Sequence, residues 1–276
     1  MKPKKIPLME KLLRDGLFDS EKAASAALME GAVYLGQTRL RGGMKVPGDA
    51  EITVRGREMP YAGKGGLKLE GALKDFGLSP AGRVCIDAGA STGGFTDCLV
   101  HFGAALVYAV DVGWGQLVGR LRQDSRVVNC EKTNISDPRL LELSPRPDFG
   151  TVDVSYLSLR KAVPYFSAIL HGRGDLVCLV KPLFEIDDAE SRRTGVIARD
   201  RYVPLLRELA ADLNQLPGTG CVNVTYSPVT GNAGTREFFF HVKLTGDETP
   251  ERPDLEDRIL LADERAAALE AYKKPT

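Results

Sequence analysis

Short apolar runs alternate with amphipathic stretches through most of the chain. The runs occupy residues 84–89, 106–113, 127–134, 149–155, 174–182, 221–229 and 237–244, and helical patterns lie near 93–103, 159–171 and 200–215. The runs are continuous, as in parallel strands that are buried on both faces. This order over residues 83–245 predicts a doubly wound, Rossmann-like α/β domain. Because no long helix separates the last two runs, we expect them to form an antiparallel hairpin at the edge of the sheet.

The first 59 residues show a different pattern. Leucines recur at helical spacing over residues 8–17, which predicts a first helix. A second helix is expected from a cap at Asp19 or Ser20 to a stop at Gly31. Short strand-like pieces broken by glycines follow. Residues 1–59 are therefore predicted to form a small α+β domain.

Two further segments flank the predicted large domain. Residues 60–82 contain Pro60, several glycines and an amphipathic pattern, so we interpret them as a linker and the helix that leads into the domain. Residues 246–276 hold 5 Lys/Arg against 9 Asp/Glu, a net charge of −4. We interpret them as a polar, partly helical C-terminal tail.

Composition narrows the possible partners. The 276 residues are 43% hydrophobic and 27% charged, as expected for a packed, soluble fold. Residues 1–60 hold 11 Lys/Arg against 8 Asp/Glu, a net charge of +3 that is compatible with a nucleic-acid partner. No apolar run approaches the ~20 residues of a membrane span, and the N-terminus lacks the apolar core of a secretory signal. We therefore expect a cytoplasmic protein with no membrane partner.

The cysteines and histidines predict neither a disulfide framework nor a metal site. Five cysteines are widely spaced and form no CxxC pair: Cys85, Cys98, Cys130, Cys178 and Cys221. They are interpreted as free thiols in a reducing compartment. The three histidines do not cluster along the chain.

A glycine-rich turn follows the first strand of the large domain, in the sequence DAGASTGGF over residues 87–95. It lacks the lysine of a phosphate-binding GxxxxGK[ST] loop, and Ser91 replaces the second glycine of a dinucleotide-binding GxGxxG turn. Asp111 ends the next strand 24 residues after Asp87, near the offset expected of a carboxylate that binds ribose hydroxyls. These features fit S-adenosylmethionine best. A plain tight turn between strand and helix is the alternative.

The candidate cofactor-binding residues come from this turn and from the ends of the next two strands. They are Asp87, Gly89, Ser91, Thr92, Gly93, Gly94, Phe95, Asp111 and Asn134. Asp87 and the turn are expected to face the methionine end of the cofactor, and Asp111 its ribose. Asn134 either binds near the adenine or caps the element that follows it.

Several motifs, taken in order, resemble those of the TlyA (haemolysin A-type) family of ribosomal RNA methyltransferases. They are YAGKGGLKLEGAL at 61–73, the glycine turn with VYAVDVGWGQL at 107–117, EKTN at 131–134, TVDVSYLSL at 151–159 and VKPLFE at 180–185. The catalytic domain of that family is similar to FtsJ-like ribose methyltransferases. Residues 6–55 resemble its S4-like RNA-binding domain. The resemblance implies that S-adenosylmethionine is used to methylate a cytidine 2′-hydroxyl in ribosomal RNA.

The resemblance also implies a catalytic set of two lysines and two acids, which falls here on Lys68, Asp153, Lys181 and Glu237. A ribose hydroxyl must lose its proton as the methyl group arrives, and a lysine can accept that proton once it is neutral. We hypothesise that Lys181 is the base and Asp153 its orienting partner. Lys68 and Glu237 are then expected to position the ribose.

Basic residues of the first domain and its junction are the candidates for contact with RNA phosphates. They are Lys11, Arg14, Lys22, Arg39, Arg41, Lys45 and Lys64. Such contacts provide affinity without reading sequence, and the expected partner is ribosomal RNA or a ribosomal subunit. Two alternatives are a membrane-active haemolysin and an RNA-binding protein with a vestigial cofactor pocket. The sequence lacks the strongly amphipathic cationic helix that a membrane-active haemolysin would need. The second alternative is disfavoured because all four catalytic positions are filled.

Overall fold

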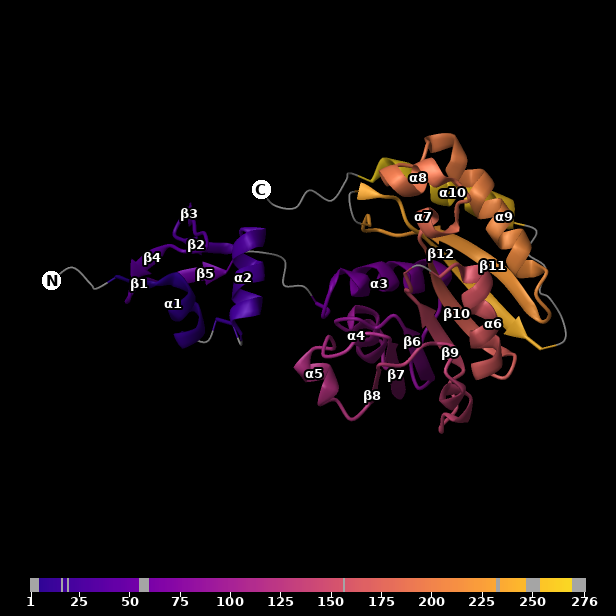
Figure 1. The fold of residues 1–276 in the computed structure, drawn as a ribbon, viewed down its shortest axis with the longest axis horizontal. Coiled ribbons are helices and arrows are strands. Elements are labelled where there is room, and N and C mark those ends of the chain that lie inside the picture. The colour runs from indigo at the N-terminus through magenta and orange to yellow at the C-terminus, as the bar shows by residue number, and fades with distance from the viewer. Residues whose placement is uncertain are drawn as a thin grey trace. The chain divides into compact units, whose positions relative to one another are not determined.

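A computed structural model describes residues 5–15, 17–18, 20–54, 60–155, 157–231, 234–246 and 254–269 of the chain. These residues fold into two compact units that divide between residues 59 and 60. The ribbon of each unit is shown in Figure 1. Each unit has its own hydrophobic core and is described by itself below.

The N-terminal unit is a small α+β fold. Its elements are β1 (Lys5–Pro7), α1 (Leu8–Arg14), α2 (Glu21–Glu30), β2 (Val33–Leu35), β3 (Thr38–Arg39), β4 (Lys45–Pro47) and β5 (Ile52–Val54). The strands form an antiparallel pair, β1–β4, and a three-stranded sheet in the order β3–β2–β5. Leu12 of α1, Leu28 of α2 and Val33 of β2 meet in its core. The two helices therefore cover the small sheets with their leucine-bearing faces.

Helix α2 has the predicted caps. The Ser20 hydroxyl accepts a hydrogen bond from the backbone N–H of Ala23 at 3.2 Å, which satisfies a donor of the first turn. Gly31 ends the helix with a left-handed φ of +74°. Ser20 is thus the N-cap, while the alternative, Asp19, lies outside the described residues.

The larger unit is built on a seven-stranded sheet. Its order is β11 (Thr219–Tyr226), β12 (Phe238–Thr245), β10 (Arg173–Val180), β9 (Phe149–Val152), β6 (Val84–Ala88), β7 (Leu106–Asp111) and β8 (Val127–Glu131). The five strands from β10 to β8 are parallel, and β12 is antiparallel to both β10 and β11. The predicted doubly wound fold with an antiparallel edge hairpin is confirmed.

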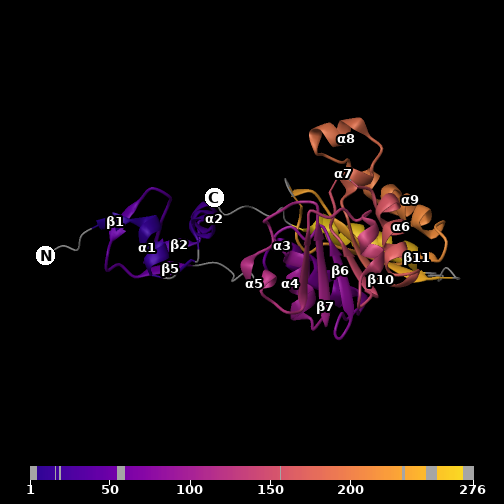
Figure 2. The ribbon, with the colours of Figure 1, turned by 60° about the horizontal axis from the view of Figure 1, so that its bottom comes forward.

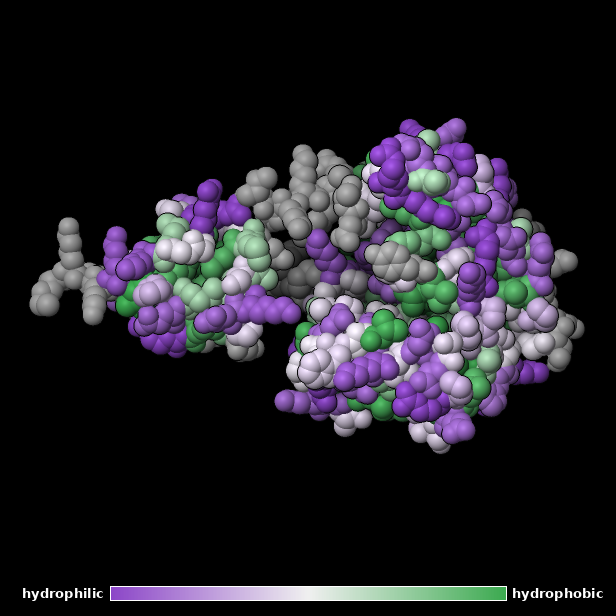
Figure 3. Space-filling model, viewed as in Figure 1, coloured by the Kyte–Doolittle hydropathy of each residue, from purple (hydrophilic) through white to green (hydrophobic). Residues whose placement is uncertain are grey.

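Helices lie on both faces of this sheet (Figures 1 and 2). They are α3 (Lys64–Phe76), α4 (Gly94–His101), α5 (Gly119–Arg122), α6 (Leu159–Ile169), α7 (Pro182–Glu185), α8 (Ala189–Thr194), α9 (Tyr202–Asn214) and α10 (Leu255–Ala268), with 3-10 turns η1 (Pro138–Glu142) and η2 (Arg199–Arg201). Along β10, Leu176 and Cys178 face the core shared with α6, α9 and α10, while Val177 faces that of α3 and α4. The strand is buried on both faces, which is why it reads as one apolar run. On the face shown in Figure 3, hydrophobic residues appear in patches between hydrophilic ones.

The two flanking segments each contain the helix that was expected, and both helices pack into the larger unit. Residues 60–82 belong to the larger unit, because α3 buries Leu69, Ala72 and Leu73 against α4 and the sheet. Residues 255–268 form α10, whose Ile259 and Ala262 are buried against β11 and α9. The polar composition of residues 255–268 gives little sign of this burial, because the apolar stripe is narrow and consists largely of small residues.

A charged cluster ties together the strand ends at the edge of the sheet opposite the carboxyl ends of the parallel strands. Asp175, near the start of β10, lies 2.8 Å from Arg83 Nη1 and 2.9 Å from His241 Nε2. Burial raises the pKa of Asp175, but its hydrogen bonds to His241 and Arg83 outweigh this and hold the pKa well below its usual range. The cluster therefore stabilises the fold in the range where Asp175 is ionised.

Asp175→Asn should lower the free energy of unfolding at pH 7 by about 3 kcal/mol, because Arg83 and His241 lose a largely buried charged partner. Since folding depresses the pKa of Asp175, this stabilisation is present above its ordinary value of 3.8 and is lost as the pH falls below it. Urea unfolding of the two proteins between pH 7 and pH 3.5 should show the gap narrowing. Asp148→Asn is the matched control: Asp148 also pairs with Arg83 but is mostly exposed, and its loss should cost under about 1 kcal/mol. Equal losses for the two variants would contradict this account.

Candidate active site

Four charged side chains meet at one edge of the large sheet. Asp153 and Lys181 directly follow the parallel strands β9 and β10, so both lie at the carboxyl edge. Glu237 directly precedes β12, whose first residue, Phe238, pairs with the last residue of β10. Because β12 runs antiparallel, its beginning lies at the same edge. Lys68 reaches this edge from α3.

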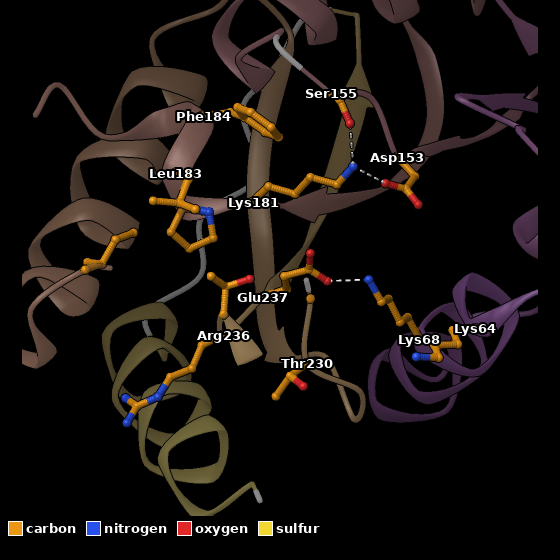
Figure 4. A pocket seen from close by; sticks show the side chains of 14 residues that line it. Lys64, Lys68, Asp153, Ser155, Lys181, Leu183, Phe184, Thr230, Arg236 and Glu237 are labelled. Atoms are coloured by element: carbon orange, nitrogen blue, oxygen red, sulfur yellow. Dashed lines mark hydrogen bonds and ion pairs between the residues drawn. The ribbon is translucent and has the colours of Figure 1, made fainter. Parts of the chain in front are cut away.

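The four groups form two ion pairs (Figure 4). Lys181 Nζ lies 2.6 Å from Asp153 Oδ1, and Lys68 Nζ donates to Glu237 Oε2 at 2.5 Å. The four side chains are only 8–22% exposed. Burial raises the pKa of Glu237 although the charge and hydrogen bond of Lys68 oppose the shift. The structure thus brings together all four residues that were predicted to be catalytic.

A cleft of about 390 Å³ opens over these pairs. Its lining combines the four charged residues with a mixed wall: Lys64, Ser155, Pro182, Leu183, Phe184, Ile197, Thr230, Gly231, Thr235 and Arg236. Lys64, the first residue of α3, lies in this cleft and so shares a site with the catalytic set. The cleft offers both cations and an apolar surface, which suits a nucleotide. We call it the acceptor cleft.

A second cleft of about 380 Å³ adjoins the first. Its lining is Ala88, Gly89, Ser91, Val110, Asp111, Val112, Gln116, Thr133, Asn134, Ile135, Asp153, Val154, Ser155 and Leu157. Asp153 and Ser155 line both clefts. A group bound in the second cleft is therefore next to a group bound in the acceptor cleft. We call the second one the donor cleft.

The glycine turn shapes the floor of the donor cleft. Gly89 adopts a left-handed φ of +87°, and a Cβ there would lie 2.2 Å from the carbonyl oxygen of Asp153. Only glycine permits so close an approach. Ser91 also has a left-handed φ, +48°, and its N–H donates to Asp111 Oδ2 at 2.8 Å. The turn is thus held between the ends of β7 and β9.

Asp111 and Glu131 hold the loop that follows β7. Asp111 Oδ1 accepts from the N–H of Gly113 at 2.6 Å, and Glu131 Oε1 accepts from the N–H groups of Gln116 and Leu117. Desolvation raises the pKa of Glu131, but hydrogen bonds from Leu117, Gln116 and other donors outweigh it and lower the pKa to about 2. The loop therefore has a fixed conformation beside the cleft.

Comparison with known proteins identifies the family. The family described as FtsJ-like methyltransferase matches residues 61–244, which are most of the larger unit and contain all four charged groups. The chain belongs to the FtsJ-like methyltransferase family. The paired charges at the junction of two clefts are therefore the candidate active site of a methyltransferase.

Relatives of this FtsJ-like methyltransferase are similar along most of their length. The Bacillus subtilis protein YqxC, provisionally named an rRNA methyltransferase, is 38% identical over 93% of this chain and 92% of its own. The 16S/23S rRNA (cytidine-2′-O)-methyltransferase TlyA of Mycobacterium tuberculosis is 35% identical over 90% of this chain and 93% of its own. A solved structure from Streptococcus thermophilus, of a protein provisionally named a hemolysin, is 34% identical and superposes with a TM-score of 0.71 over 96% of this chain and 97% of that one.

Five of the residues predicted to bind the cofactor do not line the donor cleft of the FtsJ-like methyltransferase. Asp87 was expected to face the methionine end but is fully buried, where the Thr96 and Thr151 hydroxyls donate to it. Burial raises its pKa to about 7, although these two hydrogen bonds oppose the shift. Phe95 is turned into the core against Phe239. Asp87 and Phe95 therefore support the turn from behind.

The three remaining residues of that group also have packing roles. Gly93, with a φ of +101°, lies against Leu117 and Leu121 of the next loop and helix. Gly94 begins α4 and allows close approach of the α3 backbone at Gly65. Thr92 is exposed, and its carbonyl accepts from the N–H of Val118 at 3.2 Å. These residues position the turn and α4.

The other predicted cofactor residues, Gly89, Ser91, Asp111 and Asn134, do line the donor cleft. Asn134 also has the alternative role, because its Oδ1 accepts from the N–H and hydroxyl of Ser136 at 3.0 Å. The apolar wall of the cleft was missed: Val112, Ile135, Val154 and Leu157. Val112, Val154 and Leu157 lie inside the quoted motifs at 107–117 and 151–159, and Ile135 directly follows EKTN, so their places beside strand ends were the available signal. Ser155, inside the quoted TVDVSYLSL motif, was also given no role.

Another motif residue turns out to be structural. Glu185, the last residue of VKPLFE, is buried and accepts from the Leu159 N–H at 2.8 Å and from the Ser158 hydroxyl at 2.6 Å. Burial raises its pKa, although these hydrogen bonds oppose the shift. Glu185 thus satisfies the first turn of α6. It fixes the segment between the acceptor cleft and α6.

In the N-terminal unit, Lys11 does not have the exposed position expected of an RNA contact. It is 3% exposed, pairs with Asp15 at 2.6 Å and donates to the Gly48 carbonyl. Arg14 is half exposed but shares both partners. Lys22, Arg41 and Lys45 are exposed, whereas Arg39 is partly buried over Gly31. Lys11 is therefore removed from the candidate RNA contacts.

Neither a metal nor a membrane span is indicated within the described ranges. No group of three or more His, Cys, Asp or Glu side chains there is placed to hold a metal ion. No helix in that part of the chain combines the length and the apolar composition needed to cross a bilayer.

Gly89→Ala should lower the free energy of unfolding by about 3 kcal/mol, because it adds a left-handed alanine and a clash with the Asp153 carbonyl. Gly115→Ala is the matched control, since Gly115 has a φ of +72° but no atom within 4 Å of its Cβ position. Its loss should be about 1 kcal/mol. Guanidinium unfolding measures both. Equal losses would show that the contact between Gly89 and Asp153 carries no cost.

Proposed function

We propose that the protein transfers a methyl group from S-adenosylmethionine to the ribose 2′-hydroxyl of a cytidine in ribosomal RNA. The observation that carries this proposal is the Lys181–Asp153 pair where the donor and acceptor clefts meet, with the Lys68–Glu237 pair beside it in the acceptor cleft. The relatives named as rRNA (cytidine-2′-O)-methyltransferases support the choice of nucleoside and RNA. A ribosomal substrate would place the activity in the cytoplasm.

The donor cleft fits S-adenosylmethionine by the chemistry of its lining. Asp111 uses one lone pair of each carboxylate oxygen on backbone N–H groups, which leaves acceptor capacity for two ribose hydroxyls. Val112, Ile135 and Leu157 provide apolar surface for an adenine ring. The close approach of Gly89 to the Asp153 carbonyl keeps the floor free of side chains. When bound, S-adenosylmethionine supplies a methyl group attached to a sulfonium sulfur, and the rest of the cofactor leaves as a neutral thioether.

Lys181 is the group proposed to take the proton of the 2′-hydroxyl. As the bond from O2′ to the methyl carbon forms and the bond from that carbon to sulfur breaks, the proton moves from O2′ to Lys181 Nζ. Asp153, 2.6 Å away, stabilises the ammonium that results. Alignment of hydroxyl and methyl group provides much of the rate. The positions of Asp153 and Lys181 are set by two adjacent strands, which suits this demand for alignment.

Lys68 and Glu237 are proposed to hold the ribose. Lys68 comes from α3 and Glu237 directly precedes β12, and each side chain is less than 15% exposed. Glu237 accepts from Lys68 with one oxygen, so its second oxygen can accept from a sugar hydroxyl. Lys64 lies in the same cleft and is proposed to contact a phosphate. The acceptor cleft would then recognise both sugar and backbone.

The N-terminal unit is proposed to bind ribosomal RNA as an S4-like domain. Its exposed basic residues Lys22, Arg41 and Lys45 suit contacts with phosphates. These contacts would provide affinity and orientation, while the larger unit selects the nucleotide.

Lys181→Ala should reduce methyl transfer by at least about a thousandfold, because the hydroxyl then has no base. Its affinity for S-adenosylmethionine, measured by calorimetry, should stay within about threefold of the wild type, since Lys181 does not line the donor cleft. The assay is tritiated methyl transfer onto separated ribosomal subunits, followed by mapping of the labelled ribose. Lys161→Ala, an exposed lysine on α6, is the control and should be fully active. Full activity of Lys181→Ala would refute the assigned role, and label on a base would refute ribose methylation.

Arg41→Ala combined with Lys45→Ala should weaken binding to ribosomal RNA and make it less dependent on salt. Loss of two phosphate contacts should reduce the slope of log K against log salt concentration by about 1.5. Filter binding between 50 and 200 mM KCl provides the slope. Lys74→Ala, an exposed cation of the larger unit already paired with Glu70, is the control. An unchanged slope in the double variant would remove this face from the RNA-binding surface.

A further inference from the structure

Among the described residues, Ser155 contacts the amine of Lys181 in addition to Asp153. It lies two positions after Asp153 in the loop that follows β9, and its hydroxyl accepts from Lys181 Nζ at 3.2 Å. Figure 4 shows Ser155 and Asp153 on the same side of the lysine, both directed at its nitrogen. Ser155 is exposed and lines both clefts. Its hydroxyl therefore stands where the reacting groups would meet.

The geometry of an amine gives these two contacts a consequence. Nζ is tetrahedral, with one direction taken by Cε and three left for hydrogens or the lone pair. The Ser155 hydroxyl takes one of these directions as a hydrogen-bond acceptor. Asp153 Oδ1 lies 2.6 Å from Nζ as an ion-pair partner, without hydrogen-bond geometry. In a neutral amine, one hydrogen is thus held by Ser155, and the negative charge of Asp153 repels the lone pair and favours the other hydrogen on its side.

The lone pair is then left at the third direction. We infer that Ser155 is a positioning residue that, together with Asp153, directs the lone pair of Lys181 toward the 2′-hydroxyl in the acceptor cleft. This inference rests on the proposed function and adds to it a residue that sets the orientation of the base. With Asp153 alone, the second hydrogen and the lone pair could exchange between the two remaining directions. Ser155 holds that hydrogen and so leaves one direction for the lone pair.

Other polar groups near the site have different partners. Lys68 and Glu237 are bound to each other, and Thr230 and Thr235 belong to the loop that precedes β12. Ser158, in the same loop as Ser155, caps α6 and donates to Glu185. Among the hydroxyl groups of the described residues, that of Ser155 is the one that accepts a hydrogen bond from Lys181.

Ser155→Ala should lower kcat about 30-fold, because the base is no longer held in line with the hydroxyl. KM for the ribosomal subunit and Kd for S-adenosylmethionine should stay within about threefold, since neither ligand loses a main contact. Ser155→Thr keeps the hydroxyl and should restore kcat to within about threefold. Ser125→Ala, an exposed serine before β8, should behave as the wild type.

The outcomes separate this inference from the proposed function. Ser155→Ala with wild-type kcat would overturn the inference while the wild type still methylates ribose. A drop in kcat that Ser155→Thr does not restore, or one accompanied by an equal rise in KM, would show a different role and would also overturn it. A wild-type enzyme that methylates neither subunit would overturn the proposed function and the inference with it. Unfolding curves of the two Ser155 variants, matching the wild type, would confirm that the losses are not due to misfolding.

Discussion

The active site exists because one strand of the sheet is reversed. β9 and β10 are parallel, so Asp153 and Lys181 at their carboxyl ends necessarily share an edge. β12 lies beside β10 in the opposite direction, which brings Glu237, before its first residue, to that edge as well. A parallel β12 of eight residues would place Glu237 about 26 Å away, at the other edge. The reversed strand therefore completes a charged set that an all-parallel sheet could not form.

The charged residues of the site contribute little to the stability of the fold, which comes instead from burial of apolar surface elsewhere. Partly buried ion pairs contribute little to folding, since desolvation opposes their attraction. Burial raises the pKa of Glu237, although its ion pair with Lys68 opposes the shift. The strands behind the site are apolar on both faces, and burial of such surface stabilises by about 25 cal/mol per Å². Charges that do not stabilise the fold are consistent with a role in chemistry.

Much of this arrangement could be predicted from sequence, because it depends on signals within single segments. Apolar runs on both sheet faces predict buried strands, and a charge directly after such a run, as at Lys181, marks the carboxyl edge. The burial of Asp87 could not be predicted in this way, since its partners Thr96 and Thr151 come from other elements. Lys11 was misjudged for the same reason: its acceptor at Gly48 is 37 residues away. A helix in the C-terminal tail was expected, but the packing of α10 onto the large unit was not, because its buried stripe is narrow and its composition is polar.

The two clefts are linked by a single short loop. Asp153 belongs to both, its carbonyl rests against Gly89 of the donor cleft, and its carboxylate holds Lys181 of the acceptor cleft. A shift of the glycine turn would thus move the partner of the base. Since reaction requires the methyl group and the hydroxyl to be aligned within fractions of an ångström, contact through one backbone segment is a direct way to keep both clefts in register. The glycine at position 89 is then needed for the relative placement of the two substrates as well as for room at the donor.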